Sequence, residues 1–215
     1  MQKLKIPTNI KACIFDLDGV IVDTAVYHFK AWRRLANELG FDFTEHQNEQ
    51  LKGISRMESL DLILNWGGVS LSQEEKLDWA TKKNEWYLAF VKQMPASEIL
   101  PGVRDFLLFL QSKKIKIGLG SASKNARLCL ERVEIIALFD VIIDGNHLTK
   151  SKPDPQVFLL GAEALGLNPQ DCIVFEDAVA GIQAAKAAGM LAVGIGSPTV
   201  LHEADFVFER FVGIV

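Results

Sequence analysis

Two carboxylates separated by one residue, Asp16 and Asp18, follow a short apolar run at residues 12–15. Apolar residues of types common in β-strands predict a buried strand here. Both carboxylates would then lie at its carboxyl end and face solvent or a ligand together. Ionised carboxylates at this spacing repel each other unless a cation joins them. Because a hard divalent ion such as Mg²⁺ binds carboxylate, carbonyl and phosphate oxygens, the pair indicates phosphoryl chemistry.

Further polar residues follow later strand-like runs. Such runs cover residues 11–16, 115–121, 139–144, 172–176 and 191–195, and helical patterns separate most of them. This alternation predicts an α/β fold, a Rossmann-like parallel sheet with helices on both faces, and ligands bind such sheets beyond the carboxyl ends of the strands. Those ends carry Asp16, Asp18, Ser121, Ser123, Asp144, Glu176 and Asp177. We therefore expect one polar site at this edge of the sheet.

One stretch, residues 24–94, has helical patterns and no convincing strand. Apolar residues recur at helical spacing from Ala25 to Leu39, with Gly40 as a plausible C-cap. Ser72 and Glu75 fit a capping box ahead of a second apolar pattern. The sequence thus predicts a catalytic core of residues 1–23 and 95–215 with an inserted helical domain of residues 24–94, and hinges near residues 22–24 and 93–97.

The bulk composition is that of an ordinary globular protein. The 215 residues are 49% hydrophobic and 23% charged, with a net charge of −4, so no basic face indicates a nucleic-acid partner. The apolar stretch within the N-terminal residues 1–7 is too short for a signal peptide. The sequence contains no run of about 18 apolar residues that would predict a membrane span. Three cysteines in apolar segments, Cys13, Cys129 and Cys172, have no metal-ligand spacing. We expect a monomeric cytoplasmic protein without a membrane partner.

Four segments together resemble the haloacid-dehalogenase superfamily. Residues 15–20 (FDLDGV), followed by Asp23-Thr24, are similar to its first motif, D-x-D-G at the end of the first strand. Ser121, Lys152-Pro153 and Glu176-Asp177 match its later motifs in the same order. A single D-x-D is weak evidence, but four ordered motifs spread over the chain are specific. The resemblance implies that the helical insert is the superfamily's small C1-type cap.

The resemblance implies distinct roles for the two opening carboxylates. Asp16 would be the nucleophile, attacking phosphorus to form an aspartyl-phosphate and dividing one hard transfer into two easier ones. Asp18 would be the general acid and base, protonating the leaving oxygen and later deprotonating the acceptor. Two neighbouring carboxylates serve opposite roles only when their environments separate their protonation states.

The same resemblance implies the metal site and the phosphate contacts. Mg²⁺ would be held by Asp16, the backbone carbonyl of Asp18 and Asp177, with Glu176 close by. Ser121 would donate a hydrogen bond to the transferring phosphoryl group, and Lys152 would neutralise charge on its oxygens and on Asp16.

Each of these residues has a purely structural alternative. Asp16 alone is an ordinary loop or N-cap residue. Ser121 and Ser123 could cap a helix that begins near Lys124, although an exposed helix N-terminus also suits a phosphate. Lys152 could be a solvated surface lysine, and Glu176 with Asp177 could cap a helix over residues 181–188.

Longer matches resemble the β-phosphoglucomutase branch of the superfamily. They cover residues 16–32, 48–56 and 121–125. This resemblance implies that Arg56 grips a non-reacting phosphate, for which its planar guanidinium is suited. It implies sugar contacts from Lys52, Gly53, Ser55, Ala122, Ser123, Lys124 and Asn125. The alternative for Lys52 and Arg56 is an ordinary pair of surface charges.

Thr24 and His28 are four residues apart, and so lie on one helix face close to Asp18. There the imidazole could orient the acid/base carboxylate. The alternative is an interfacial histidine whose hydrogen bonds go to the backbone.

The resemblance implies conversion of β-D-glucose 1-phosphate to D-glucose 6-phosphate through β-glucose 1,6-bisphosphate. Cap closure would exclude water, so that a sugar hydroxyl accepts the phosphoryl group. One alternative is a sugar-phosphate phosphatase in which water is the acceptor. Another is a non-catalytic phosphosugar-binding protein, against which the combination of Asp16, Asp18, Lys152 and Asp177 argues.

Overall fold

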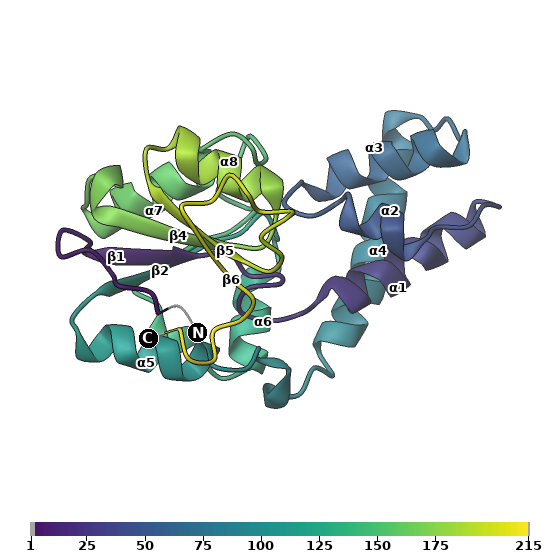
Figure 1. Ribbon diagram of the computed structural model, residues 1–215. Coiled ribbons are helices and arrows are strands. Elements are labelled where there is room, and N and C mark those ends of the chain that lie inside the picture. Colours follow the sequence, from purple (N-terminus) through teal and green to yellow (C-terminus); the bar gives the residue numbers. More distant parts are fainter. Residues whose placement is uncertain (1–2, 215) are drawn as a thin grey trace.

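The computed structural model describes residues 3–214, so Met1 and Gln2, which belong to the N-terminal stretch considered above, and Val215 lie outside it. Six strands form one parallel sheet in the order β3-β2-β1-β4-β5-β6 (Figure 1). The strands are β1 (Ala12–Phe15), β2 (Lys116–Gly120), β3 (Val141–Ile143), β4 (Cys172–Glu176), β5 (Leu191–Ile195) and β6 (Phe206–Phe208). The chain order reverses between β1 and β4, and the crevice at such a switch point is where α/β sheets bind ligands.

Helices cover both faces of the sheet, as the alternation predicts (Figure 1). Helices α5 (Val103–Ser112) and α6 (Ala126–Arg132) cover one face, and α7 (Gln156–Leu165) and α8 (Val179–Ala187) cover the other. Short 3₁₀ turns lie at Ala96–Glu98, Ile136–Leu138 and Pro169–Asp171.

Strand β1 belongs to two hydrophobic cores because its side chains alternate between the faces of the sheet. Cys13 and Phe15 are buried on the α5 side, and Ala12 and Ile14 on the α7 side. A strand buried on both faces reads as a continuous apolar run. The position of Asp16 is thereby fixed at the end of the innermost strand.

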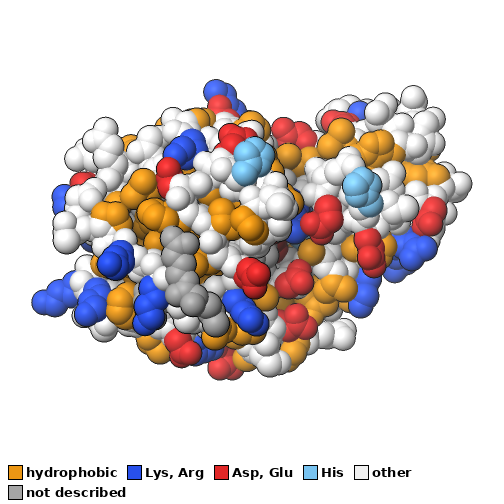
Figure 2. Space-filling view, viewed as in Figure 1, with side chains coloured by type: hydrophobic (Ala, Val, Ile, Leu, Met, Phe, Trp, Pro, Cys, Tyr) orange, Lys and Arg blue, Asp and Glu red, His pale blue; other side chains and the backbone are white. Residues whose placement is uncertain are grey.

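Four helices are inserted between β1 and α5: α1 (Ala25–Glu38), α2 (Glu45–Glu49), α3 (Arg56–Gly67) and α4 (Gln73–Val91). They bury a third hydrophobic cluster of their own, which includes Trp32, Leu35, Leu60 and Ile63. In Figure 2 they form a lobe beside the sheet domain, with acidic and basic side chains interspersed on the face shown. The predicted fold class, a parallel sheet core with a helical insert, is confirmed.

Three of these helices begin with a capping box, in which the N-cap hydroxyl and the N3 side chain each bond the other's backbone N–H. The pairs are Thr44 with Gln47, Ser55 with Glu58, and Ser72 with Glu75. Only the third of these capping boxes was predicted from the sequence. Gly40, with φ of +90°, follows α1 as the predicted C-cap glycine.

Other details differ from the sequence-based expectations or complete them. The helix after Ser123 begins at Ala126, and its N-cap residue Asn125 makes no side-chain cap bond. Near the C-terminal end, residues 206–208 form β6, parallel to β5. The three cysteines are buried and form no disulfide. Among the described helices, none combines the length and the apolar character needed to cross a lipid bilayer.

Candidate active site

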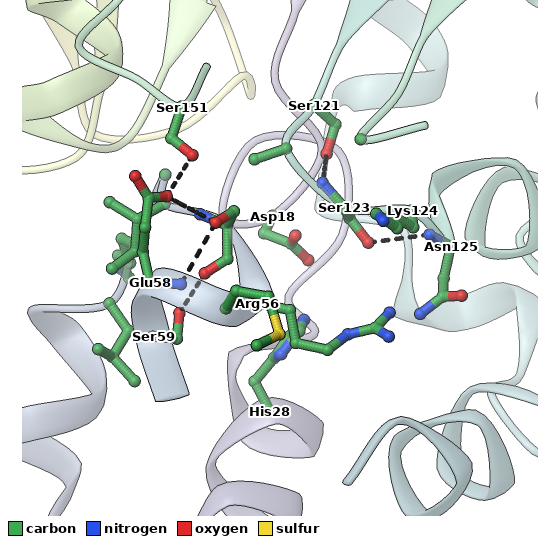
Figure 3. A pocket seen from close by; sticks show the side chains of 18 of the residues that line it. Asp18, His28, Arg56, Glu58, Ser59, Ser121, Ser123, Lys124, Asn125 and Ser151 are labelled. Atoms are coloured by element: carbon green, nitrogen blue, oxygen red, sulfur yellow. Dashed lines mark hydrogen bonds between the residues drawn. The ribbon is translucent and has the colours of Figure 1, made fainter. Parts of the chain in front are cut away.

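A cavity of about 600 Å³ lies between the carboxyl edge of the sheet and the helical insert, which we call the cap. The core lines it with Asp16, Asp18, Ser121 and Asp177, and the cap with His28 and Arg56, among others. Figure 3 shows side chains from both units around this space. The fold therefore gathers residues from distant parts of the chain at the switch point of the sheet.

Lys152 joins two carboxylates at the floor of this site. Its Nζ lies 2.5 Å from Oδ1 of Asp16 and 2.5 Å from Oε1 of Glu176. Lys152 is only 2% exposed, which excludes the solvated surface lysine. Burial opposes its charged form, but the carboxylates of Asp16 and Glu176 outweigh burial and raise the pKa of Lys152. The two carboxylates thus favour the charged form of Lys152 beside the expected nucleophile.

Asp16 and Asp18 have different surroundings. The backbone N–H of Asp18 donates to Oδ2 of Asp16 at 2.9 Å, and the hydroxyl of Thr24 donates to Oδ1 of Asp18. Burial, followed by the negative charge of Asp16, raises the pKa of Asp18 to about 7. Asp16 has an ammonium partner and Asp18 a hydroxyl partner, and this difference is what separate roles as nucleophile and acid/base require.

Glu176 and Asp177 lie beside this pair and are not helix caps. The buried Glu176 accepts from the N–H of Ala178 at 2.7 Å through Oε2, before α8 begins at Val179. Asp177 pairs with Lys52 of the cap, Oδ2 to Nζ 3.0 Å. Burial raises the pKa of both carboxyls, and the charge of Asp16 adds to that rise.

The charges at the site fit a divalent cation. Four carboxylates, Asp16, Asp18, Glu176 and Asp177, face the two ammonium groups of Lys152 and Lys52. Within residues 3–214 no group of three or more His, Cys, Asp or Glu side chains is placed so that it could hold a metal ion. Mg²⁺ does not require one, because it keeps waters and phosphate oxygens among its ligands.

Gly19 permits the close approach of Asp177 to the loop after β1. Its φ is +77°, and a Cβ placed there would lie 2.2 Å from Oδ2 of Asp177. The D-x-D-G motif therefore needs its glycine for both backbone conformation and space.

A ladder of hydrogen bonds shapes the loop after β2. The N–H of Ser123 donates to Oγ of Ser121 at 3.1 Å, and the N–H of Asn125 donates to Oγ of Ser123 at 3.2 Å (Figure 3). The two serines thus order a loop and do not cap α6, which corrects that structural alternative. Ala122 and Lys124 line the cavity from the same loop. Asn125 also donates to Oδ1 of Asn84 in the cap at 2.9 Å.

His28 lies close to a lysine that the sequence analysis did not single out. Its Nδ1 is 2.9 Å from Nζ of Lys83, and its ring centroid is 4.2 Å from that of Tyr87. Burial, then the charge of Lys83, lowers the pKa of His28. Within the described chain, Lys83 is its hydrogen-bonding partner and Asp18 is not, so a direct contact of His28 with Asp18 is absent from this structure.

The predicted substrate residues of the cap lie at the cavity. Lys52, Gly53, Ser55 and Arg56 all line it. The hydroxyl of Ser55 is occupied as the N-cap of α3. Arg56 extends into the pocket in Figure 3, and no carboxylate of residues 3–214 forms an ion pair with its guanidinium. A cation in the pocket without a protein partner is available to an anionic ligand.

Four residues at the site were missed from the sequence: Glu58, Lys83, Asn84 and Tyr87. Lys83 carries a signal, because Ala80, Lys83, Tyr87 and Val91 form the buried face of α4. A lysine on such a face needs a partner. Glu58 carries another, the S-x-x-E pattern of residues 55–58.

The fold and the site together define a capped α/β enzyme with a carboxylate-centred active site. A family model described as haloacid dehalogenase-like hydrolase matches residues 10–189. The chain belongs to this family.

Relatives with known names cover nearly the whole chain. The chain is 46% identical over 203 residues to "Beta-phosphoglucomutase" of Bacillus subtilis, covering 94% of this chain and 90% of that protein. It is 34% identical to "Phosphorylated carbohydrates phosphatase" of Thermotoga maritima, covering 84% and 82%. The crystal structure of beta-phosphoglucomutase from Clostridium difficile superposes with a TM-score of 0.92 at 48% identity, covering 94% and 92%. The sugar-phosphate phosphatases are thus the more distant relatives.

Proposed function

We propose that this protein is a β-phosphoglucomutase, an isomerase that interconverts β-D-glucose 1-phosphate and D-glucose 6-phosphate through β-glucose 1,6-bisphosphate. The similarity to two proteins of that name supports the proposal. The structural observation that carries it is the position of Arg56 in the cap, facing the same cavity as Asp16 in the core. A hydrolase needs one phosphate site, whereas a bisphosphate intermediate needs two.

In the half-reaction that phosphorylates the enzyme, a carboxylate oxygen of Asp16 attacks one phosphorus of the bisphosphate, and the bond from that phosphorus to the sugar oxygen breaks, which releases glucose monophosphate. Lys152 orients Asp16 and neutralises charge on the phosphoryl oxygens, because its ammonium contacts that carboxylate at 2.5 Å. Ser121 lies at the end of β2, where its hydroxyl can donate to the same group. The product of this step is an aspartyl-phosphate.

Asp18 handles the proton. With a pKa of about 7 it is available in both forms near neutral pH, so it can protonate a leaving oxygen and later accept a proton from the attacking hydroxyl. Thr24 holds this carboxylate through its hydroxyl.

Mg²⁺ would be held by Asp16, the backbone carbonyl of Asp18 and Asp177, with Glu176 beside them. When bound, it supplies positive charge that stabilises the phosphoryl oxygens. The site has more carboxylates than the two ammonium groups of Lys52 and Lys152 can balance, and this excess of negative charge supports the assignment.

Arg56 would hold the phosphate that is not reacting. The bisphosphate must turn over between the half-reactions, so that each phosphate in turn reaches Asp16 and Arg56. Because a guanidinium binds any phosphate through two parallel N–H groups, the same residue serves both orientations.

The free buried cysteines of the chain are consistent with a reducing cytoplasm as its compartment.

Transfer to water on the same scaffold is the second candidate, favoured by the 34% identity to a phosphatase. The two functions differ only in the acceptor. We would supply β-glucose 1-phosphate, Mg²⁺ and a trace of the bisphosphate, and measure glucose 6-phosphate and free phosphate together. A mutase gives mainly glucose 6-phosphate. Mainly free phosphate would contradict the proposal and establish the phosphatase.

A further inference from the structure

Glu58 makes a contact that its capping box does not require. Its Oε2 accepts from the N–H of Ser55 at 2.9 Å and from the hydroxyl of Ser55 at 2.6 Å. The same oxygen also accepts from the hydroxyl of Ser151, which is 93 residues away in the core (Figure 3). A side chain of the cap is thus bonded to the core.

The capping box of α4 shows what capping alone involves. Oε2 of Glu75 accepts from the N–H of Ser72 at 2.7 Å and from its hydroxyl at 2.8 Å. These distances match those at Ser55 and Glu58. Among the described hydrogen bonds, however, Glu75 has no partner outside its own helix start. The two capping boxes have the same local motif, so the bond to Ser151 arises from the location of Glu58 next to the core and not from capping.

The two ends of this contact belong to the elements that carry the expected phosphate-binding cations. Ser151 directly precedes Lys152, whose ammonium contacts Asp16. Glu58 lies two residues after Arg56, in the first turn of α3. Both Glu58 and Ser151 line the cavity, and Glu58 is exposed, so the bond lies at the rim.

The charge on Glu58 strengthens the contact. Burial raises the pKa of Glu58, but the hydrogen bonds from Ser151 and Ser55 outweigh it and lower the pKa below its ordinary value. A hydroxyl donating to an ionised carboxylate makes a stronger bond than two neutral groups do.

We infer that Glu58 and Ser151 form a latch that holds the cap on the core and favours the sugar over water as phosphoryl acceptor. The hydroxyl of Ser151 reaches Glu58 only when α3 lies over the loop of residues 144–155, which we call the Lys152 loop, so the bond stabilises this arrangement of cap and core. Closure excludes water from the aspartyl-phosphate. Glu58 is thus a positioning residue, acting through Arg56 and the Lys152 loop. The inference rests on the proposed mutase function for its effect on products.

Ser151→Ala removes the latch and leaves the capping box intact. Glu75→Ala is the matched control, because it removes an equivalent capping box that has no latch. We expect Ser151→Ala to raise the free phosphate formed per glucose 6-phosphate about fivefold, since the lost bond is charge-assisted but lies at an exposed rim. Ser151→Thr retains the hydroxyl and should restore the wild-type ratio, while Glu75→Ala should lower thermal stability without changing the ratio.

Hydrogen exchange of the substrate-free proteins gives a readout that does not depend on the product. Amides of residues 52–59 and 148–152 should exchange faster in Ser151→Ala than in the wild type, and at wild-type rates in Ser151→Thr. An unchanged product ratio together with unchanged exchange in Ser151→Ala would overturn the latch. If the wild type itself releases mainly phosphate, the mutase proposal fails, and faster exchange in Ser151→Ala would still establish the latch as a closing contact.

Discussion

The amine of Lys83 lies 2.9 Å from Nδ1 of His28, inside the cap and away from solvent. Lys83 is 2% exposed, and its amine also lies over the rings of Trp32 and Tyr87, at 4.2 Å and 5.0 Å from their centroids. Burial, then the charge of Arg56, lowers the pKa of Lys83. The donor of this contact depends on the histidine tautomer: when the amine donates to Nδ1, the imidazole is neutral and carries its proton on Nε2.

This pair predicts a pH dependence of stability. Burial and the charge of Lys83 lower the pKa of His28 in the folded state, whereas in the unfolded state its pKa is about 6.5. The unfolded state therefore binds the proton first as the pH falls. The stability associated with neutral His28 is fully present above about pH 6.5 and is lost below it, by at most about 1.4 kcal/mol per pH unit.

Urea unfolding from pH 8 to pH 5 tests this dependence. In His28→Gln the imidazole is absent, so its free energy of unfolding should fall less on acidification than that of the wild type. Parallel curves for the two proteins would show that His28 does not titrate on unfolding as described.

Lys152→Met should destabilise the fold. It removes the shared partner of Asp16 and Glu176 and leaves two buried carboxylates uncompensated, which costs about 3–5 kcal/mol. Denaturant unfolding in the presence of a chelator measures the change without compensation by a metal. Lys186→Met is the matched control, because it breaks an exposed pair with Asp205 and should cost less than about 1 kcal/mol. Equal losses in both variants would contradict the structural role of Lys152.

Asp16→Asn should abolish turnover while the protein stays folded. The amide has nearly the same shape but cannot form the acyl phosphate, so we expect a loss of at least about 10³-fold in kcat. Circular dichroism and thermal unfolding verify the fold, and Asp61→Asn, at an exposed residue of α3, controls for the change in charge. Activity near the wild-type value would refute Asp16 as the nucleophile.

Arg56→Ala should separate two reactions of the same protein. We expect kcat/KM for β-glucose 1-phosphate to fall on the order of 10²-fold, because a charge-assisted contact with the distal phosphate is lost. Hydrolysis of acetyl phosphate, which has no distal phosphate, should change little. Arg33→Ala, at an exposed arginine paired with Asp42, should affect neither reaction. Equal losses on both substrates would remove the distal-phosphate role.

The parts of the fold that were predicted correctly depend on local patterns. The run before Asp16 is apolar because β1 is buried on both faces of the sheet. The S-x-x-E pattern from Ser72 to Glu75 identifies the start of α4 from four consecutive residues alone. The gathering of Asp16, Ser121 and Glu176 followed from the rule that parallel strands end at one edge.

The parts that were missed depend on contacts between distant segments. The spacing of Lys83 from Ala80 and Tyr87 places it on an apolar helix face, but only the packing of α4 against α1 brings it beside His28. Glu58 was recognisable as a capping residue, but its bond to Ser151 spans 93 residues and two structural units. The alternative in which Ser121 and Ser123 cap a helix failed because the chain makes one more turn before α6 begins.

The most direct test of the proposed function follows the phosphorylated enzyme itself. The protein is phosphorylated with acetyl phosphate and Mg²⁺, freed of excess reagent, and mixed with β-glucose 1-phosphate or with buffer, while the loss of aspartyl-phosphate and the products are measured. The proposal predicts that the sugar phosphate greatly accelerates this loss and that the phosphoryl group appears in the bisphosphate and in glucose 6-phosphate. An equal rate of loss with and without the sugar phosphate, with all of the phosphoryl group released as free phosphate, would contradict it.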